Sequence, residues 1–165
     1  MAGRLDTDLP QLIDDGMRQT SPATRLYNCI AWAADDDRRW WWPADGGYWP
    51  PGAPRVETLA AFVSAYGTLG YVPCDGELWE IGFEKIVIYC LNGYPTHAAK
   101  QLDTGLWTSK LGPSWDVEHR TTGGVEGPVY GQVAQFLRRP IADRARLRTR
   151  LVFVHLLAMV APEGP

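Results

Sequence analysis

The sequence lacks a strong charge imbalance and a long uninterrupted apolar run. Its formal net charge is -3 over 165 residues, which gives no electrostatic reason to expect nucleic-acid binding. The apolar stretch at residues 151–161 is interrupted by His155 and is too short to span a bilayer, so no membrane role is expected. The acidic N-terminus has no apolar signal-peptide core. We therefore expect a cytoplasmic protein and leave export by a specialised route open.

The sequence also lacks the cysteine pattern of a disulfide framework. Its three cysteines, Cys29, Cys74 and Cys90, are odd in number and widely spaced, which favours a reducing compartment. Their spacing does not make a zinc knuckle with any of the three histidines. No metal and no organic cofactor is expected, and Cys74 and Cys90 are interpreted as inert.

Tryptophan, in contrast, is abundant. Four of the eight tryptophans lie within residues 40–49, in a stretch too rich in proline and glycine for regular structure. This stretch predicts an ordered loop that either lines a substrate cleft or is pinned to the domain by its own aromatic rings. Lys110 is either a substrate-binding cation or an ordinary solvated lysine. The candidate substrate-binding residues are Trp40, Trp41, Trp42, Trp49, Trp107 and Lys110.

A short helix is predicted within residues 27–34, with Cys29 near its start. A cysteine at a helix N-terminus experiences the positive end of the helix dipole, which favours the nucleophilic thiolate. The alternative is a small buried residue that packs the helix. The preceding Asn28 has two readings as well: its amide stabilises an oxyanion beside the backbone N–H of Cys29, or its side chain caps the helix.

The middle of the chain predicts an antiparallel meander. A β-branched run at residues 85–90 ends at Asn92-Gly93, a strong hairpin signal, and residues 95–102 and 106–111 follow as two further strands. An amphipathic helix is expected at residues 56–66. Residues 1–20 are expected to be a lead-in with a short helix, residues 114–129 a loop, residues 130–137 a short helix or strand, and residues 141–150 a basic helix.

His97 lies in the central strand of this meander and is the candidate general base for Cys29. Strand pairing across the second turn places it near Ser109, about twelve positions on. Ser109 is therefore a candidate for the polar group that orients the imidazole, with Asp116 and Glu118 in the following loop as charged alternatives. His119 and His155 are interpreted as structural.

This order of a helix cysteine, a strand histidine and a polar residue on the next strand resembles the papain-like superfamily, and more closely its NlpC/P60-like and related amidase domains. The segments 27–33, 39–43, 95–99 and 107–112 also resemble an uncharacterised bacterial domain family of unknown function, over residues 21–140. The papain-like resemblance implies Cys29 as nucleophile, His97 as base and Ser109 in the third position, where such domains more often carry His, Asn, Asp or Gln. It also implies that the substrate is a peptide or protein amide.

The sequence thus predicts an α+β, papain-like fold in which N-terminal helices that carry Cys29 pack on a small antiparallel sheet that carries His97. Residues 21–140 form the domain, preceded by the lead-in of residues 1–20, and residues 141–165 form a C-terminal extension with a disordered end. The expected function is a cysteine-dependent hydrolase of amide bonds, of the kind found in bacterial hydrolases, toxins and effectors. The alternative is a non-catalytic module that binds a peptide, glycan or protein through the Trp-rich loop. A partner or immunity protein is a further option.

Overall fold

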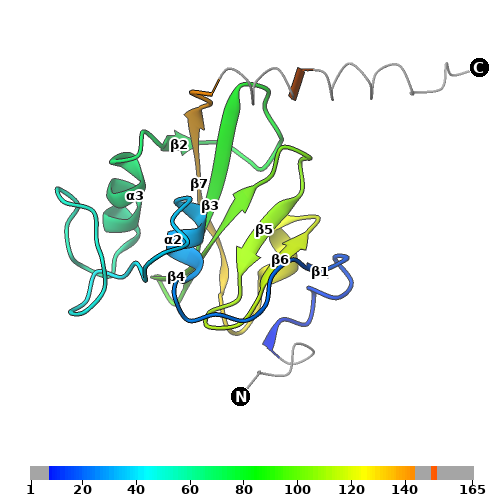
Figure 1. The fold of residues 1–165 in the computed structure, drawn as a ribbon, viewed down its shortest axis with the longest axis horizontal. Coiled ribbons are helices and arrows are strands. Elements are labelled where there is room, and N and C mark those ends of the chain that lie inside the picture. The colour runs from blue at the N-terminus through cyan, green and yellow to red at the C-terminus, as the bar shows by residue number, and fades with distance from the viewer. Residues whose placement is uncertain (1–7, 144–149, 152–165) are drawn as a thin grey trace, which may run out of the picture.

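The structure, a computed structural model, describes residues 8–143 and 150–151. Its centre is a seven-stranded sheet with the order β1-β6-β5-β4-β3-β7-β2, in which each pair of neighbouring strands is antiparallel. The strands are β1 (Arg18–Gln19), β2 (Val72–Cys74), β3 (Phe83–Leu91), β4 (Tyr94–Gln101), β5 (Trp107–Lys110), β6 (Asp116–His119) and β7 (Gln132–Pro140). In Figure 1, the long strands β3, β4 and β7 form the middle of the molecule.

The helices are short. They are α2 (Cys29–Ala33), α3 (Leu59–Gly67) and a 3-10 turn, η1 (Thr122–Val125). The expectation of a papain-like α+β fold was therefore wrong, because the described residues form a large antiparallel sheet on which α2 and α3 are the short helices. Two segments expected to be loop or undecided supply strands: β6 lies within residues 114–129, and β7 extends the sheet beside β3.

The predicted meander is present as β3, β4 and β5. Asn92 and Gly93 form the first turn with φ angles of 52° and 84°, as a tight hairpin of this kind requires. The helix expected from residue 56 begins at Leu59, because Thr58 has extended backbone and its hydroxyl accepts the N–H of Ala61. The lead-in contributes turns and β1.

Two cores cover the two faces of the sheet. Strand residues alternate between the faces, so Ile86, Ile88 and Ala98 pack against α2 and α3 in the first core. Val87, Tyr89 and Ala99 point the other way, into the second core with Trp107 and Val117. Figure 1 shows α2 lying over β4. Cys29 therefore meets the sheet at the strand that carries His97.

Most of the predictions for the C-terminal extension concern residues outside the described ones. These are most of the helix at 141–150, the apolar run at 151–161, His155, and the disordered end. Arg150 is described, and its guanidinium is buried against Asp103 and the carbonyl of Phe83. Within the described residues, no helix has the length and apolar character that crossing a membrane requires.

Candidate active site around Cys29 and His97

Asn28 builds the start of α2. Its Oδ1 accepts the N–H of Ala31 at 3.1 Å and that of Trp41 at 3.2 Å, while its Nδ2 donates to the carbonyl of Trp41 at 2.7 Å. The side chain thus caps the helix and holds the Trp-rich loop at the same time. The prediction that Asn28 caps the helix is confirmed, and its role as an oxyanion donor stays a prediction.

Cys29 is the first residue of α2 and its side chain is buried. The sulfur lies 3.9 Å from the carbonyl oxygen of Thr96, the residue before His97. Burial raises the pKa of Cys29 to about 11, although the backbone N–H groups of Ala98, Ile30 and Cys29, and the charge of Lys110, act in the opposite direction. At neutral pH the closed site therefore holds a thiol.

His97 is fully buried in β4. Its Nε2 lies 3.0 Å from the hydroxyl oxygen of Ser109, and its Nδ1 has no hydrogen-bond partner among the described residues. Burial, with a smaller contribution from nearby His119, lowers the pKa of His97 to about 3. The imidazole is therefore neutral at physiological pH, and Nδ1 is the ring atom left without a partner.

The surroundings of the His97 ring place it in the second core. The ring stacks on Tyr130 at a centroid distance of 4.0 Å and lies 5.4 Å from the ring of Tyr89. Cys29 belongs to the first core, and no hydrogen bond joins its sulfur to either nitrogen of His97 in the described structure. The sulfur approaches the backbone of β4 from one face of the sheet, whereas the imidazole points to the other face, so the thiol and the imidazole are not paired.

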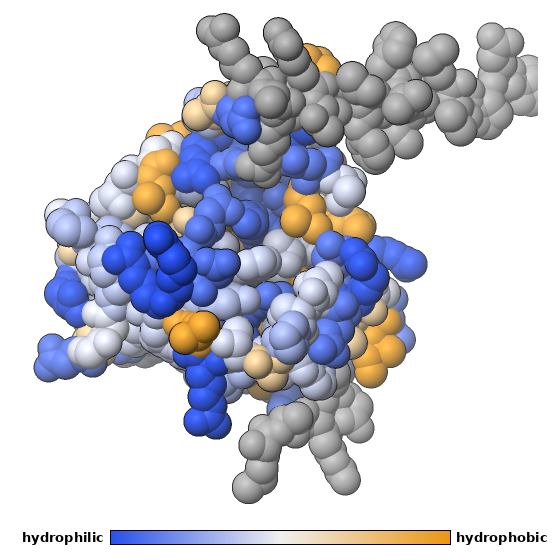
Figure 2. All heavy atoms as spheres, in the orientation of Figure 1, coloured by the Kyte–Doolittle hydropathy of each residue, from blue (hydrophilic) through white to orange (hydrophobic). Residues whose placement is uncertain are grey.

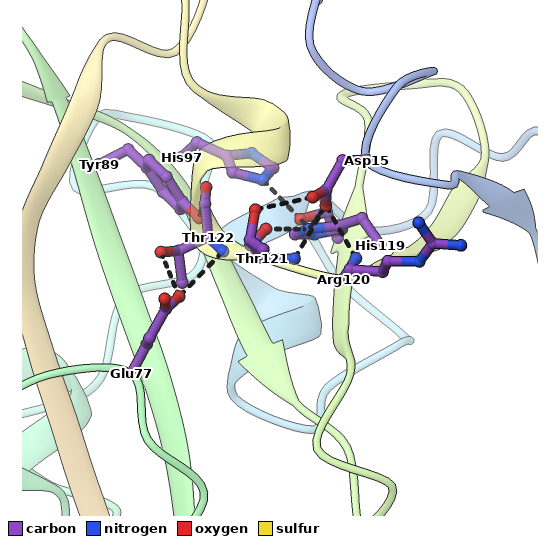
Figure 3. Close-up of polar contacts among 9 residues, drawn as sticks. Asp15, Glu77, Tyr89, His97, His119, Arg120, Thr121 and Thr122 are labelled. Atoms are coloured by element: carbon purple, nitrogen blue, oxygen red, sulfur yellow. Dashed lines mark hydrogen bonds and ion pairs between the residues drawn. The ribbon is translucent and has the colours of Figure 1, made fainter.

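Ser109 connects two histidines on three adjacent strands. Its Oγ lies 3.0 Å from His97 Nε2 and 2.9 Å from Nε2 of His119 on β6. His119 Nδ1 in turn lies 2.7 Å from the carbonyl oxygen of Thr121 and 3.8 Å from a carboxylate oxygen of Asp15. Figure 3 shows this group, with Asp15 also accepting the backbone N–H groups of Arg120 and Thr121. Sequence reasoning missed the place of His119 in this group.

Asp116, one of the two alternative third residues, lies elsewhere. One of its carboxylate oxygens accepts the hydroxyl of Tyr27 at 2.6 Å, and the other has no hydrogen-bond partner in the described structure. Tyr27 belongs to the first core, with α2. Ser109 is thus the residue that the structure brings to the His97 ring, and its catalytic role stays a prediction.

Lys110 is fully buried, so the reading as a solvated lysine does not describe it. Its ammonium donates to the carbonyl of Ser114 and lies 5.3 Å from the centre of the Tyr27 ring. Burial lowers the pKa of Lys110, while Asp116 and Cys29 raise it. The structure thus places a cation near the buried thiol and gives it no open route to solvent.

The tryptophans mainly hold the protein together. Trp41, Trp49 and Trp107 are buried, and only Trp40, which is 39% exposed, presents a large part of its surface. Trp42 and Trp49 both pack edge-on against Phe62 of α3. The loop at residues 40–54 is therefore pinned to the first core, and Trp40 is the member left for contact with another molecule.

No metal site accompanies this arrangement in the described part of the chain, where no group of three or more His, Cys, Asp or Glu side chains is placed to hold an ion. The fold and the site thus define a β-rich domain with a buried cysteine beside a histidine–serine–histidine cluster. A family model, described as a domain of unknown function (DUF7689), matches residues 18–138, and the chain belongs to that family. No curated protein and no solved structure matches the chain.

Proposed function

We propose that this domain is a cysteine-dependent hydrolase of amide bonds, with Cys29 as nucleophile and His97 as base. The observation that carries the proposal is the unpartnered Nδ1 of His97, buried in the strand whose backbone the Cys29 sulfur contacts. Buried polar atoms are nearly always hydrogen-bonded, so the orphaned nitrogen of this buried imidazole marks a functional candidate. The proposal keeps the residue order of papain-like hydrolases without their fold.

The proposed chemistry has two stages, acylation of Cys29 and hydrolysis of the thioester. Once a rearrangement has brought the thiol and the imidazole together, the thiol proton moves to Nδ1 of His97, and the sulfur attacks the carbonyl carbon of the amide. The tetrahedral oxyanion forms next to the backbone N–H of Cys29, and His97 then returns the proton to the leaving amine. Water hydrolyses the resulting thioester, with His97 as the base, and restores the thiol. Ser109 keeps the ring in place throughout, by its contact with Nε2.

The proposed chemistry requires a rearrangement of the structure, because the thiol lies in the first core and the imidazole faces the second. Cys29 and His97 are both buried, and their pKa values of about 11 and about 3 keep both groups neutral. Proton transfer between them is favourable only when solvent or substrate changes this environment. Tyr130, which stacks on His97, is the side chain whose displacement would uncover the ring from the second core.

The test is the rate at which iodoacetamide alkylates each cysteine, resolved by peptide mass spectrometry between pH 6 and 9. If His97 accepts the thiol proton, His97→Phe will slow alkylation of Cys29 by roughly tenfold or more, while Cys74 and Cys90 serve as internal controls. If Cys29 is only a packing residue, the same substitution leaves its rate unchanged or raises it by loosening the core. A Cys29 that does not react in the wild-type protein also contradicts the proposal.

Turnover is tested with a panel of fluorogenic peptide amides, with Cys29→Ala as the matched inactive variant. Hydrolysis that survives Cys29→Ala would remove Cys29 from the mechanism. Release of ammonia from glutamine-containing peptides, measured in parallel, separates deamidase chemistry from cleavage of the peptide amides.

A second candidate is a non-catalytic module that binds a peptide, glycan or protein. The burial of Cys29 and the absence of a thiol–imidazole hydrogen bond in the described structure favour it. Its contact surface would include Trp40 of the aromatic loop. Figure 2 shows the hydrophobic residues of one face in separate patches rather than one continuous area, so such a partner would contact mainly polar surface there. Unchanged Cys29 alkylation in His97→Phe, together with binding lost in Trp40→Ala, would support this candidate.

A further inference from the structure

His119 has a place in this site that its position in the sequence does not reveal. It lies on β6, two strands from His97, and is connected to it only through the hydroxyl of Ser109. A hydroxyl both donates and accepts, so Ser109 alone does not decide which nitrogen of His97 carries the proton. His119, the second partner of this hydroxyl, decides which nitrogen of His97 carries the proton.

The direction of the hydrogen bonds follows from one carbonyl. The oxygen of Thr121 only accepts, so Nδ1 of His119, 2.7 Å away, carries a proton. In a neutral ring the other nitrogen, Nε2, is then an acceptor. It lies 2.9 Å from Ser109 Oγ and takes the hydroxyl proton, which is the only proton that Ser109 has to give.

The direction of the hydrogen bond between Ser109 and His97 follows from this use of the hydroxyl proton. With its proton directed at His119, Ser109 Oγ accepts from His97, so the proton on the His97 ring is at Nε2. Nδ1 of His97 then holds a lone pair. This is the nitrogen without a partner in the described structure, and it is the form that a general base needs.

We infer that His119 is a positioning residue that, through Ser109, fixes His97 in the Nε2–H tautomer and leaves Nδ1 free to accept a proton. The role of this tautomer in catalysis rests on the proposed function, but the tautomer itself does not. Burial lowers the pKa of His119, which keeps this ring in the neutral form that the chain of hydrogen bonds requires. Asp15 supports the position of His119 by binding the backbone N–H groups of residues 120 and 121 (Figure 3).

The experiment is nitrogen-15 NMR of the full chain with labelled histidine at neutral pH, since ring nitrogen shifts distinguish the two neutral tautomers. The expected result is opposite tautomers in the two buried rings: Nε2–H in His97 and Nδ1–H in His119. The signals are assigned from the spectra of His97→Gln and His119→Gln. A His97 ring protonated at Nδ1, or the same tautomer in both rings, overturns the inference.

Two substitutions at His119 separate a positioning role from a packing role. His119→Phe keeps a ring of similar shape but removes the acceptor, which frees the Ser109 proton for His97 Nε2, and the His97 tautomer is expected to reverse to Nδ1–H. His119→Gln keeps an acceptor at the end of the side chain and is expected to retain Nε2–H. If both variants fold and leave the tautomer of His97 unchanged, His119 only fills space.

Ser109→Ala removes the hydroxyl that connects the two histidine rings, so His97 is then expected to show a mixture of tautomers. A further His119→Phe substitution is expected to leave that mixture unchanged. These spectra do not depend on the reactivity of Cys29. Opposite tautomers with an unreactive Cys29 would uphold the inference and contradict the proposed hydrolase. Identical tautomers with a reactive Cys29 would contradict the inference and support the proposed hydrolase.

Discussion

Asn28 holds both backbone groups of Trp41, thirteen residues further along the chain. Its Nδ2 donates to the Trp41 carbonyl at 2.7 Å, and its Oδ1 accepts the Trp41 N–H at 3.2 Å. The same oxygen accepts the N–H of Ala31 and so caps α2. One buried amide therefore fixes the position of Cys29 and the base of the Trp-rich loop together.

Asn28→Ala is expected to lower the free energy of unfolding by about 2–4 kcal/mol. A lost N-cap costs about 1 kcal/mol, and leaving the buried backbone groups of Trp41 without partners costs about 1–3 kcal/mol. Urea unfolding followed by tryptophan fluorescence measures the change. Asn28→Ser keeps a side-chain acceptor for the N–H of Ala31 and loses the contacts with Trp41, so an intermediate value is expected. Equal effects of the two substitutions would contradict this division.

Tyr27→Phe is expected to destabilise the domain by about 1.5–3 kcal/mol, the usual worth of a hydrogen bond to a charged group. The hydroxyl of Tyr27 donates to one oxygen of Asp116 at 2.6 Å, and the other oxygen has no hydrogen-bond partner in the described structure. The substitution would leave a buried carboxylate almost without donors. Tyr27→Phe should lower the free energy of unfolding less in a protein that already carries Asp116→Asn. A double-mutant cycle measures the difference. A cycle that shows no coupling would contradict the contact.

Gly131→Ala and Gly93→Ala form a matched pair, because both glycines have positive φ angles, 76° and 84°. A Cβ at Gly93 meets nothing within 4 Å, so its substitution should cost only the backbone strain, about 1–2 kcal/mol. A Cβ at Gly131 would lie 1.9 Å from the carbonyl oxygen of Cys90, which forces the backbone apart. We expect a clearly larger loss or no folded protein, measured by urea unfolding or circular dichroism. Similar losses at both positions would contradict the close contact.

The stability of the domain should fall as the pH falls below about 6.5, the pKa of histidine in an unfolded chain. Burial lowers the pKa of folded His97 to about 3, so between these values the unfolded chain binds a proton that the folded one does not. The free energy of unfolding therefore rises with pH in this window, by up to about 1.4 kcal/mol per pH unit for one proton. His119, also with a lowered pKa, acts in the same direction.

Urea unfolding at pH 7, 6 and 5 checks this dependence. His97→Gln carries no titrating group at that position and should show a smaller slope than the wild-type protein. An unchanged slope in the variant would mean that His97 is solvated and titrates normally in the folded state.

The local parts of the fold could be predicted from the sequence. The turn at Asn92-Gly93 and the β-branched run before it predict the β3–β4 hairpin, which the structure confirms. Pairing across the next turn aligns Ala99 with Ser109, and this register brings Ser109 to the His97 ring. Such contacts follow from strand alternation and short turns, and need no knowledge of the rest of the chain.

The parts of the fold that depend on pairing between distant segments could not be predicted from the sequence. Strand β6 reads Asp-Val-Glu-His, with three residues that do not favour strands, and it forms because β5 and β1 pair with it on both sides. Strand β7 joins β3 from more than forty residues away. The position of His119 depends on the pairing of β6 with its neighbours. Local sequence patterns therefore did not predict it. The burial of Lys110 is likewise a product of packing around Tyr27 and Ser114.

The cluster of His97, Ser109 and His119 runs across β4, β5 and β6, three neighbouring strands joined by main-chain hydrogen bonds. Its members have little freedom to shift against one another. Cys29, in contrast, sits on a five-residue helix, and Tyr130 lies in a segment closed by paired hydrogen bonds between Gly127 and Gly131. The two parts of the proposed site are thus held differently: the histidines stand on three hydrogen-bonded strands, and the cysteine stands on one short helix.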